Sequence, residues 1–368
     1  MSKKTVPFIL GFLLLNGFWA FAQVRYAKGF TLQKHGQFTV LKVIKPWPGA
    51  KQSYTYVLRR KGVFIPKAYA QYTQVVVPVQ RMIATSTTHL PSIESLGMLP
   101  KLVGFPHTDY ISSAVIREYI EAGKLTDVGS NTDLNIEKVL ALRPDAFIGY
   151  GVDRESAGLL HVKNQGIPII MNGDWNEEDP LGKAEWIKFF GALFDQQTKA
   201  NKQFNRIEKA YINVRNLAAK TKTKPRVFTG ALWEGIWHLP KGDSWVGKLL
   251  RDAGSHYLWQ DTHGTGSLSL SLEQVLAQAQ NADFWVAPGG FDSRRALLAN
   301  NAHYQQFKAF QNNNVFTYSL KRGKKGGMLY YELAPNRPDL VLKDLVYLFH
   351  PELFPGYKPY FYQSLQNE

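Results

Sequence analysis

Two eight-residue segments of this chain, 134–141 and 270–277, are versions of one sequence. They read Leu-Asn-Ile-Glu-Lys-Val-Leu-Ala and Leu-Ser-Leu-Glu-Gln-Val-Leu-Ala, with five identical positions at a constant offset of 136 residues. Each segment leads through a short helix-like stretch into an apolar run that is typical of a buried strand. The repeat predicts two similar lobes, each presenting one glutamate, Glu137 or Glu273, at the start of a helix.

Short apolar runs alternate with helical stretches in both halves of the chain. Alternation of strands and helices predicts a mainly parallel sheet with helices on its faces. The strands that we expect lie at 75–84, 102–105, 146–149 and 167–171 in the first half, and at 226–230, 257–259, 284–287 and 315–318 in the second.

The segment 181–221 does not show this alternation of strands and helices. Apolar or small residues recur at steps of three and four from residue 186 to residue 218, and no proline lies between Pro180 and Pro225. This periodicity predicts one long helix that joins the two lobes as a rigid rod.

The remaining boundaries follow from local patterns at the N-terminus. Two lysines, an apolar run at 8–15 and the sequence Ala20-Phe21-Ala22 form a secretory signal peptide, which we expect to be cleaved after Ala22. A retained membrane anchor is the alternative, but the apolar run is short for a membrane span.

Strands at 38–46 and 54–60 around a Pro-Gly turn predict an N-terminal β-hairpin. The predicted domains are the signal peptide 1–22, an N-terminal lobe 23–180, a connecting helix 181–221 and a C-terminal lobe 222–368.

Composition excludes several classes of site. The chain has no cysteine, which rules out disulfides, thiolate metal sites, cysteine nucleophiles and a lipid-modified N-terminal cysteine. We therefore expect the mature protein to be soluble. The formal net charge is +15 and favours anionic ligands or surfaces. No block of lysine and arginine is long enough to indicate nucleic acid as a partner, and secretion argues against it.

The order of several segments resembles the periplasmic substrate-binding proteins of ABC importers for ferric siderophores, haem and cobalamin. The resemblance covers essentially the whole mature chain and rests on the stretches 83–89, 127–129, 134–145, 242–254, 270–283 and 337–340. It implies an α/β fold with two Rossmann-like lobes joined by one long α-helix. It also implies a monomer in the periplasm that binds a small-molecule metal chelate and docks on an inner-membrane ABC permease dimer.

The same resemblance gives the two repeated glutamates a role. In the family, the glutamates equivalent to Glu137 and Glu273 lie on the lobe tips and pair with arginines on the two permease subunits. A simpler interpretation exists for each residue alone. Asn135 and Ser271 are N-cap residue types, and a carboxylate in the first helical turn stabilises the helix dipole by roughly 0.3–1 kcal/mol. The occurrence of both at one offset favours permease docking.

In such a fold the ligand lies between the lobes, against loops at the carboxyl ends of the strands. These loops are rich in aromatic and basic side chains. Arginine forms forked bonds to carboxylate, catecholate or hydroxamate oxygens, and aromatic faces pack on rings. This chemistry favours a ferric siderophore, with haem or cobalamin as alternatives. Core packing is the alternative for each tryptophan, and a solvated loop charge for each arginine. The candidate ligand-binding residues are Thr88, His89, Arg154, Trp175, Trp233, Trp237, Arg294, Arg295, Arg322 and Tyr331.

An enzyme is the remote alternative. His238, Asp243 and Ser244 lie close in sequence, but no Gly-x-Ser-x-Gly elbow indicates a hydrolase, and no Gly-x-Gly-x-x-Gly follows a strand. His89 and His107 belong to no carboxylate–histidine cluster with metal-ligand spacing, so we expect no protein metal site and no cofactor. The sequence predicts a binding protein that makes and breaks no bond.

Overall fold

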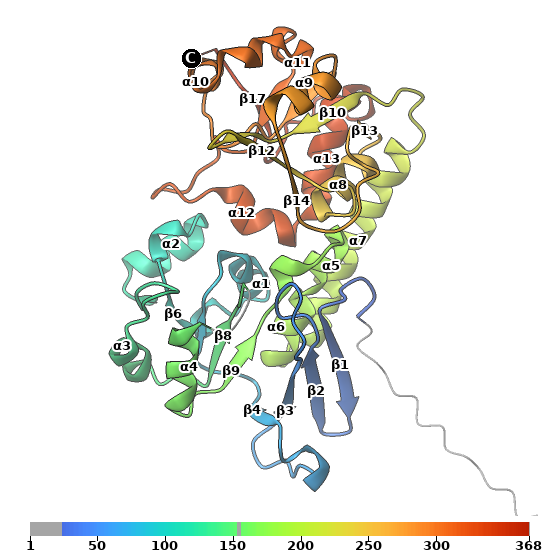
Figure 1. Ribbon diagram of the computed structural model, residues 1–368. Helices are drawn as coiled ribbons and strands as arrows, with labels where there is room; N and C mark the ends of the chain where they lie inside the picture. The colour runs from blue at the N-terminus through green and yellow to red at the C-terminus, as the bar shows by residue number, and fades with distance from the viewer. Residues whose placement is uncertain (1–23, 153–155, 368) are drawn as a thin grey trace, which may run out of the picture.

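The computed structural model describes residues 24–152 and 156–367. The predicted signal peptide with its cleavage site, and the candidate residue Arg154, lie outside these ranges. Figure 1 shows two lobes, one above the other, with the C-terminal half of the chain forming the upper lobe. Within the described ranges, no helix combines the length and the apolar character that a membrane span needs.

The N-terminal lobe is built on a five-stranded parallel sheet in the order β7-β6-β5-β8-β9. Apart from the edge strand β7, the strands are largely apolar because helices cover the sheet, as is usual for parallel sheets. The strands are β5 (Met82–Ala84), β6 (Leu102–Phe105), β7 (Thr126–Asp127), β8 (Ala146–Gly149) and β9 (Ile169–Met171), and the helices are α1 (Leu90–Ser95), α2 (Ala114–Glu121), α3 (Ile136–Ala141) and α4 (Ala157–Asn164).

The C-terminal lobe repeats this plan. Its main sheet has the order β13-β10-β15-β16-β17, in which only the edge strand β17 is antiparallel. The order β13-β10-β15-β16 is equivalent to β6-β5-β8-β9, so the two lobes predicted from the repeat are present. The strands are β10 (Arg226–Thr229), β13 (His256–Tyr257), β15 (Phe284–Val286), β16 (Val315–Thr317) and β17 (Gln363–Ser364), and the helices are α8 (Trp245–Asp252), α9 (Leu272–Ala279), α10 (Arg294–Asn300), α11 (Lys308–Gln311), α12 (Leu329–Leu333) and α13 (Pro338–Phe349).

Two additional sheets flank the lobes. A small antiparallel sheet of β11 (Ala231–Trp233), β12 (Ile236–Pro240) and β14 (Ser267–Leu270) belongs to the upper lobe and was not predicted. At the N-terminus, β1 (Phe30–His35), β2 (Phe38–Val43), β3 (Tyr54–Arg59) and β4 (Thr73–Val76) form a four-stranded sheet. The expected hairpin corresponds to the antiparallel pair β2 and β3, which is the middle of this larger sheet.

The strand predicted at 75–84 is two strands in different sheets. Residues 75–76 end β4, and β5 begins at Met82. Pro78 lies between them and has no backbone N–H to donate to a ladder, so one continuous strand is unfavourable there.

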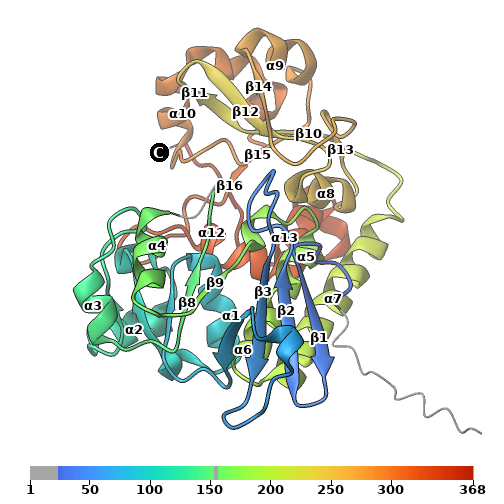
Figure 2. The same ribbon diagram turned by 60° about the horizontal axis from the view of Figure 1, so that its bottom comes forward.

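The prediction of one long connecting helix is wrong. The segment forms α5 (Pro180–Glu185), α6 (Ile187–Leu193) and α7 (Gln197–Ala218). The chain turns at Asp195, whose backbone is left-handed with φ of 55°. A Cβ at Gly191 would lie 2.6 Å from the Cβ of Ala200, so this glycine allows α6 and α7 to approach closely. The long helix α7 runs beside both lobes, as Figures 1 and 2 show.

Candidate functional site

A buried glutamate of the upper lobe holds the first turn of a helix in the lower lobe. Glu332 on α12 is 3% exposed. Its carboxylate accepts hydrogen bonds from the backbone N–H groups of Ser112 at 2.6 Å and Ser113 at 3.0 Å. These groups stand at the N-terminus of α2, where the helix dipole favours a negative charge. Glu332 therefore acts as a cap supplied across the lobe junction.

Close backbone contacts surround this cap. A Cβ at Gly327 would lie 2.0 Å from the carbonyl oxygen of Tyr110, and one at Gly323 would lie 2.6 Å from the Cα of Ser112. The Ser112 hydroxyl donates to the Gly327 carbonyl at 2.9 Å. Because any side chain larger than hydrogen would collide, the two glycines let the loop 321–328 lie directly on the lower lobe.

A second contact between the lobes involves the predicted ligand residue Thr88, through its backbone. Asn336 donates to the Thr88 carbonyl at 2.8 Å and accepts from the Ser92 hydroxyl at 2.7 Å. The Thr88 hydroxyl hydrogen-bonds with that of Ser86 at 2.9 Å. Thr88 thus contributes to holding the lobes together in this structure.

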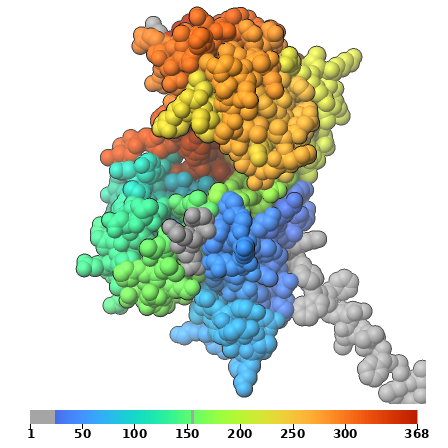
Figure 3. Space-filling model, viewed as in Figure 1, coloured from blue at the N-terminus to red at the C-terminus, as the bar shows by residue number. Residues whose placement is uncertain are grey.

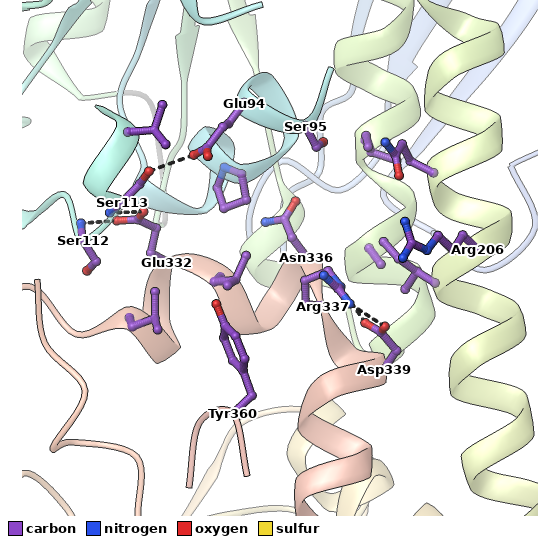
Figure 4. Close-up of a pocket in the computed structure, with 18 of the residues that line it drawn as sticks. Glu94, Ser95, Ser112, Ser113, Arg206, Glu332, Asn336, Arg337, Asp339 and Tyr360 are labelled. Atoms are coloured by element: carbon purple, nitrogen blue, oxygen red, sulfur yellow. Dashed lines mark hydrogen bonds and ion pairs between the residues drawn. The ribbon is translucent and has the colours of Figure 1, made fainter. Parts of the chain in front are cut away.

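A cavity of about 650 Å³ lies between these contacts and α7 (Figure 4). Both lobes supply polar groups to its wall, including Glu94 from α1 and Asn336 from the upper lobe. Arg206 of α7 lies across the cavity from Glu94, and Arg337 is held by two hydrogen bonds to Asp339, at 2.9 and 2.8 Å. Of the predicted ligand residues within the described ranges, none lines this cavity. Nothing in the residue types of these helices distinguishes them from ordinary surface positions, so the sequence did not indicate the cavity.

Burial, helped by the nearby carboxylate of Glu94, raises the pKa of Glu332 to about 7, although the hydrogen bonds from Ser112 and Ser113 oppose this shift. A proton therefore binds more tightly to the folded protein than to the unfolded chain, in which a glutamate titrates near 4.5. The stabilisation from this group is fully present below that value and decreases as the pH rises towards 7. We expect the thermal midpoint of Glu332→Gln to depend less on pH than that of the unchanged protein, between about pH 5 and about pH 8. The control is Glu118→Gln, an exposed carboxylate on the same helix α2. An equal pH dependence in all three proteins would contradict this role.

The other side of the lobe junction is an open hollow. Figure 3 shows the space-filling surface indented between the lobes, below the yellow β11–β12 hairpin. On the lower lobe, a pocket of about 320 Å³ is lined by residues such as Thr85, Asn131 and Tyr150, which follow the strands of the sheet. The Asn131 amide donates to the Thr85 carbonyl and to the Tyr150 hydroxyl, both at 3.2 Å. Trp175 lies beside this pocket, because its indole N–H donates to the Gly151 carbonyl at 3.1 Å and Gly151 is one of the lining residues.

The two candidate tryptophans of the β11–β12 hairpin have opposite environments. Trp233 is 70% exposed, whereas Trp237 is fully buried. The Trp237 indole donates to the Thr229 carbonyl at 2.9 Å, and its ring packs on those of Trp285 and Tyr304, with centroids 5.6 and 5.7 Å away. The prediction that Trp237 contacts ligand is therefore corrected, since its side chain belongs to the core of the upper lobe.

His89 is also buried, which leaves it no access to a ligand in the hollow. Its ring is fully enclosed, neither ring nitrogen has a hydrogen-bond partner, and Nε2 lies 4.0 Å from the Asp174 carboxylate. Burial lowers the pKa of His89, with Asp174 opposing the shift. In the described ranges no group of three or more His, Cys, Asp or Glu side chains is arranged to hold a metal ion.

The remaining candidate ligand-binding residues differ in their exposure and in the partners that their side chains already have. The Arg294 guanidinium donates to the Phe310 carbonyl at 2.7 Å and covers the Phe310 ring at 3.9 Å, so its charge is already engaged. Arg295 is exposed, and Arg322 is exposed with only its Nε bonded, to the Ser319 carbonyl at 2.9 Å. Tyr331 is 56% exposed, and its hydroxyl lies 3.2 Å from that of Tyr318.

The repeated glutamates occupy equivalent places on the two lobes. Glu137 and Glu273 are exposed in the first turns of α3 and α9. The helices begin at the caps Asn135 and Ser271, and a hydrogen bond from Ser271 lowers the pKa of Glu273. In Figures 1 and 2, α3 lies at the outer edge of the lower lobe and α9 at the top of the upper lobe.

Comparison with known proteins identifies the class. A family model described as periplasmic binding protein matches residues 82–320, and the chain belongs to this family. An uncharacterized lipoprotein of Methanocaldococcus jannaschii is 27% identical over 94% of this chain and 86% of its own. A vitamin B12-binding protein of Vibrio parahaemolyticus is 22% identical over 69% of this chain and 86% of its own. The structure of a possible iron-binding periplasmic solute-binding protein of Staphylococcus epidermidis superposes with a TM-score of 0.59, at 18% identity, over 74% of this chain and 99% of that chain.

The family consists of solute-binding proteins, so this chain is not an enzyme, as the sequence predicted. The two-lobed α/β architecture is also confirmed by the superposition. A small-molecule ligand and a membrane permease as partner follow from the class.

Proposed function

We propose that the protein captures a ferric siderophore between its lobes in the periplasm and delivers it to an inner-membrane ABC permease dimer. The observation that carries this proposal is the set of exposed side chains that follow the parallel strands. The aromatic members are Trp175, Trp233 and Tyr331, and the cationic members are Arg295 and Arg322. Aromatic faces and exposed guanidinium groups together suit a ring-bearing, oxygen-rich anion.

The relatives support the class of ligand. One is named for vitamin B12 and one for possible iron binding, and both names are consistent with a ligand that contains a metal. Haem or cobalamin is the second candidate, favoured by the exposed area of Trp233, which could pack on a large flat ring. We propose that the protein acts as a monomer after cleavage of residues 1–22.

Removing the two exposed arginine charges tests the charge of the ligand. The double variant Arg295→Gln and Arg322→Gln should weaken binding of an anionic ferric chelate by roughly 30- to 1,000-fold, because each charge-assisted contact contributes about 1–2 kcal/mol. Cobalamin, which is not an oxygen-rich anion, should be hardly affected. Affinities are measured by isothermal titration calorimetry, with Lys202→Gln and Lys209→Gln on the exposed face of α7 as the control. An equal loss in variant and control would contradict a role for these arginines.

A further inference from the structure

The N-terminal sheet lies outside the family match and has an unusual charge. The match begins at residue 82, whereas β1 to β4 end at Val76. The first acidic residue of the whole chain is Glu94. Before it, residues 24–81 contain eleven lysines and arginines, namely Arg25, Lys28, Lys34, Lys42, Lys45, Lys51, Arg59, Arg60, Lys61, Lys67 and Arg81.

Most of this charge is not neutralised by the rest of the fold. In the part of the chain that the structure describes, only two of the eleven cations form ion pairs. These are Arg25 with Glu208 and Arg60 with Asp195, at 2.7 and 2.6 Å. All seven lysines of the segment are exposed and none takes part in an ion pair within those ranges. The sheet therefore carries a strong positive field of its own.

An apolar side chain projects from one end of this sheet. The loop 60–72 lies at the end farthest from the upper lobe, and it forms the pale blue protrusion at the bottom of Figures 1 and 3. Ile65 and Tyr69 pack on the small apolar cluster of Phe38, Val40 and Val57, which anchors the loop to the sheet. Phe64 lies next to this anchor but is 83% exposed.

Cations flank the exposed phenylalanine in sequence, and a groove beside it is also basic. Arg59, Arg60 and Lys61 precede it and Lys67 follows it. Lys34, at the end of β1, lines the same groove as Arg60 and Lys61. We call the group of Lys34, Arg60, Lys61, Phe64 and Lys67 the basic tip.

We propose that the basic tip docks on an anionic phospholipid surface. Phosphate headgroups attract lysines near a membrane surface, and an exposed apolar side chain gains free energy when it enters the boundary of the acyl chains. A soluble acidic polymer would match the lysines but would leave Phe64 in water. The combination of an anchored loop, an exposed phenylalanine and neighbouring cations therefore favours a bilayer. Such docking would hold the protein beside a membrane although the chain has no cysteine for lipid attachment.

Vesicle sedimentation tests the electrostatic part of the proposal. The purified protein should sediment with vesicles of phosphatidylcholine mixed with phosphatidylglycerol, not with phosphatidylcholine alone, and high salt should release it. The double variant Lys61→Gln and Lys67→Gln should bind the anionic vesicles at least about tenfold more weakly, since each surface lysine contributes about fivefold. The matched control is Lys222→Gln and Lys224→Gln, which removes two exposed lysines from the other lobe. Equal loss in both variants would show general charge attraction and overturn the proposal.

A single label tests the insertion of Phe64. Because the chain has no cysteine, Phe64→Cys creates a unique site for an environment-sensitive NBD dye. Its emission should rise and shift to the blue with anionic vesicles, whereas dye at Thr223→Cys, exposed on the opposite lobe, should not respond. The proposal is overturned if neither dye responds, or if the protein binds an acidic polysaccharide such as heparin but not the vesicles.

Discussion

Replacing Trp237 with alanine should lower the free energy of unfolding of the upper lobe by about 3–5 kcal/mol, the usual range for a fully buried tryptophan. Its ring packs on Trp285, Tyr304, Phe307 and Phe228, and its indole N–H satisfies the Thr229 carbonyl. The variant loses this burial, leaves a cavity and frees a buried carbonyl oxygen.

Trp233→Ala is the matched control because it removes the same side chain from the same hairpin. Trp233 is 70% exposed, so its loss should change the free energy of unfolding by less than about 0.5 kcal/mol. Chemical denaturation followed by circular dichroism measures both variants. If ligand contacts Trp233, its affinity falls in this variant while stability does not. Similar stability for the two variants would show that Trp237 does not belong to the core.

The double variant Glu137→Ala and Glu273→Ala should abolish most uptake through the importer while leaving ligand affinity unchanged. Each exposed glutamate lies in the first turn of a helix on a different lobe. Neither lines the cavity between the lobes or the pocket on the lower lobe. A charge pair at a protein interface contributes about 1.5 kcal/mol or more, so losing two should weaken permease binding by at least about a hundredfold.

The simpler interpretation of these residues predicts a different result. As partners of the helix dipole they contribute only about 0.3–1 kcal/mol each to folding, which is too little to affect uptake. Cellular uptake of labelled ligand is compared with calorimetric affinity, using Glu118→Ala and Asp261→Ala, two exposed carboxylates elsewhere on the lobes, as the control. Full uptake in the double variant, or an equal loss of ligand affinity, would contradict permease docking.

The two lobes could be predicted from the sequence because their signals are local. The repeated segments each carry an N-cap residue, a first-turn glutamate and the apolar positions of one helix face, and each helix leads into an equivalent strand, β8 or β15. The break between α6 and α7 involves the left-handed backbone of Asp195 and the close approach of Gly191 to Ala200. A search for apolar positions at steps of three and four does not detect either feature, so it merged the two helices.

The candidate site was harder to predict, because the direction of each side chain determines whether it can contact a ligand or belongs to the core. Trp233 and Trp237 have the same residue type on one hairpin, but only Trp237 points to the core, together with Leu239 two residues later. That alternation could have been recognised if β12 had been assigned as a strand. The role of Glu332 could not be predicted from the sequence, because it depends on a hydrogen bond from the backbone of Ser112, which is 220 residues away in sequence.

Tryptophan fluorescence of the purified protein, titrated with ferric siderophores, haem and cobalamin, tests the central claim most directly. Trp175 and Trp233 are the exposed candidates next to the loops after the strands, so a ligand bound there should quench them. The proposed function predicts saturable quenching by ferric siderophores, with a weaker response in Trp233→Ala. Saturable binding of haem or cobalamin alone would replace the proposed ligand, and no saturable response to any of the three would contradict the capture of a metal chelate between the lobes.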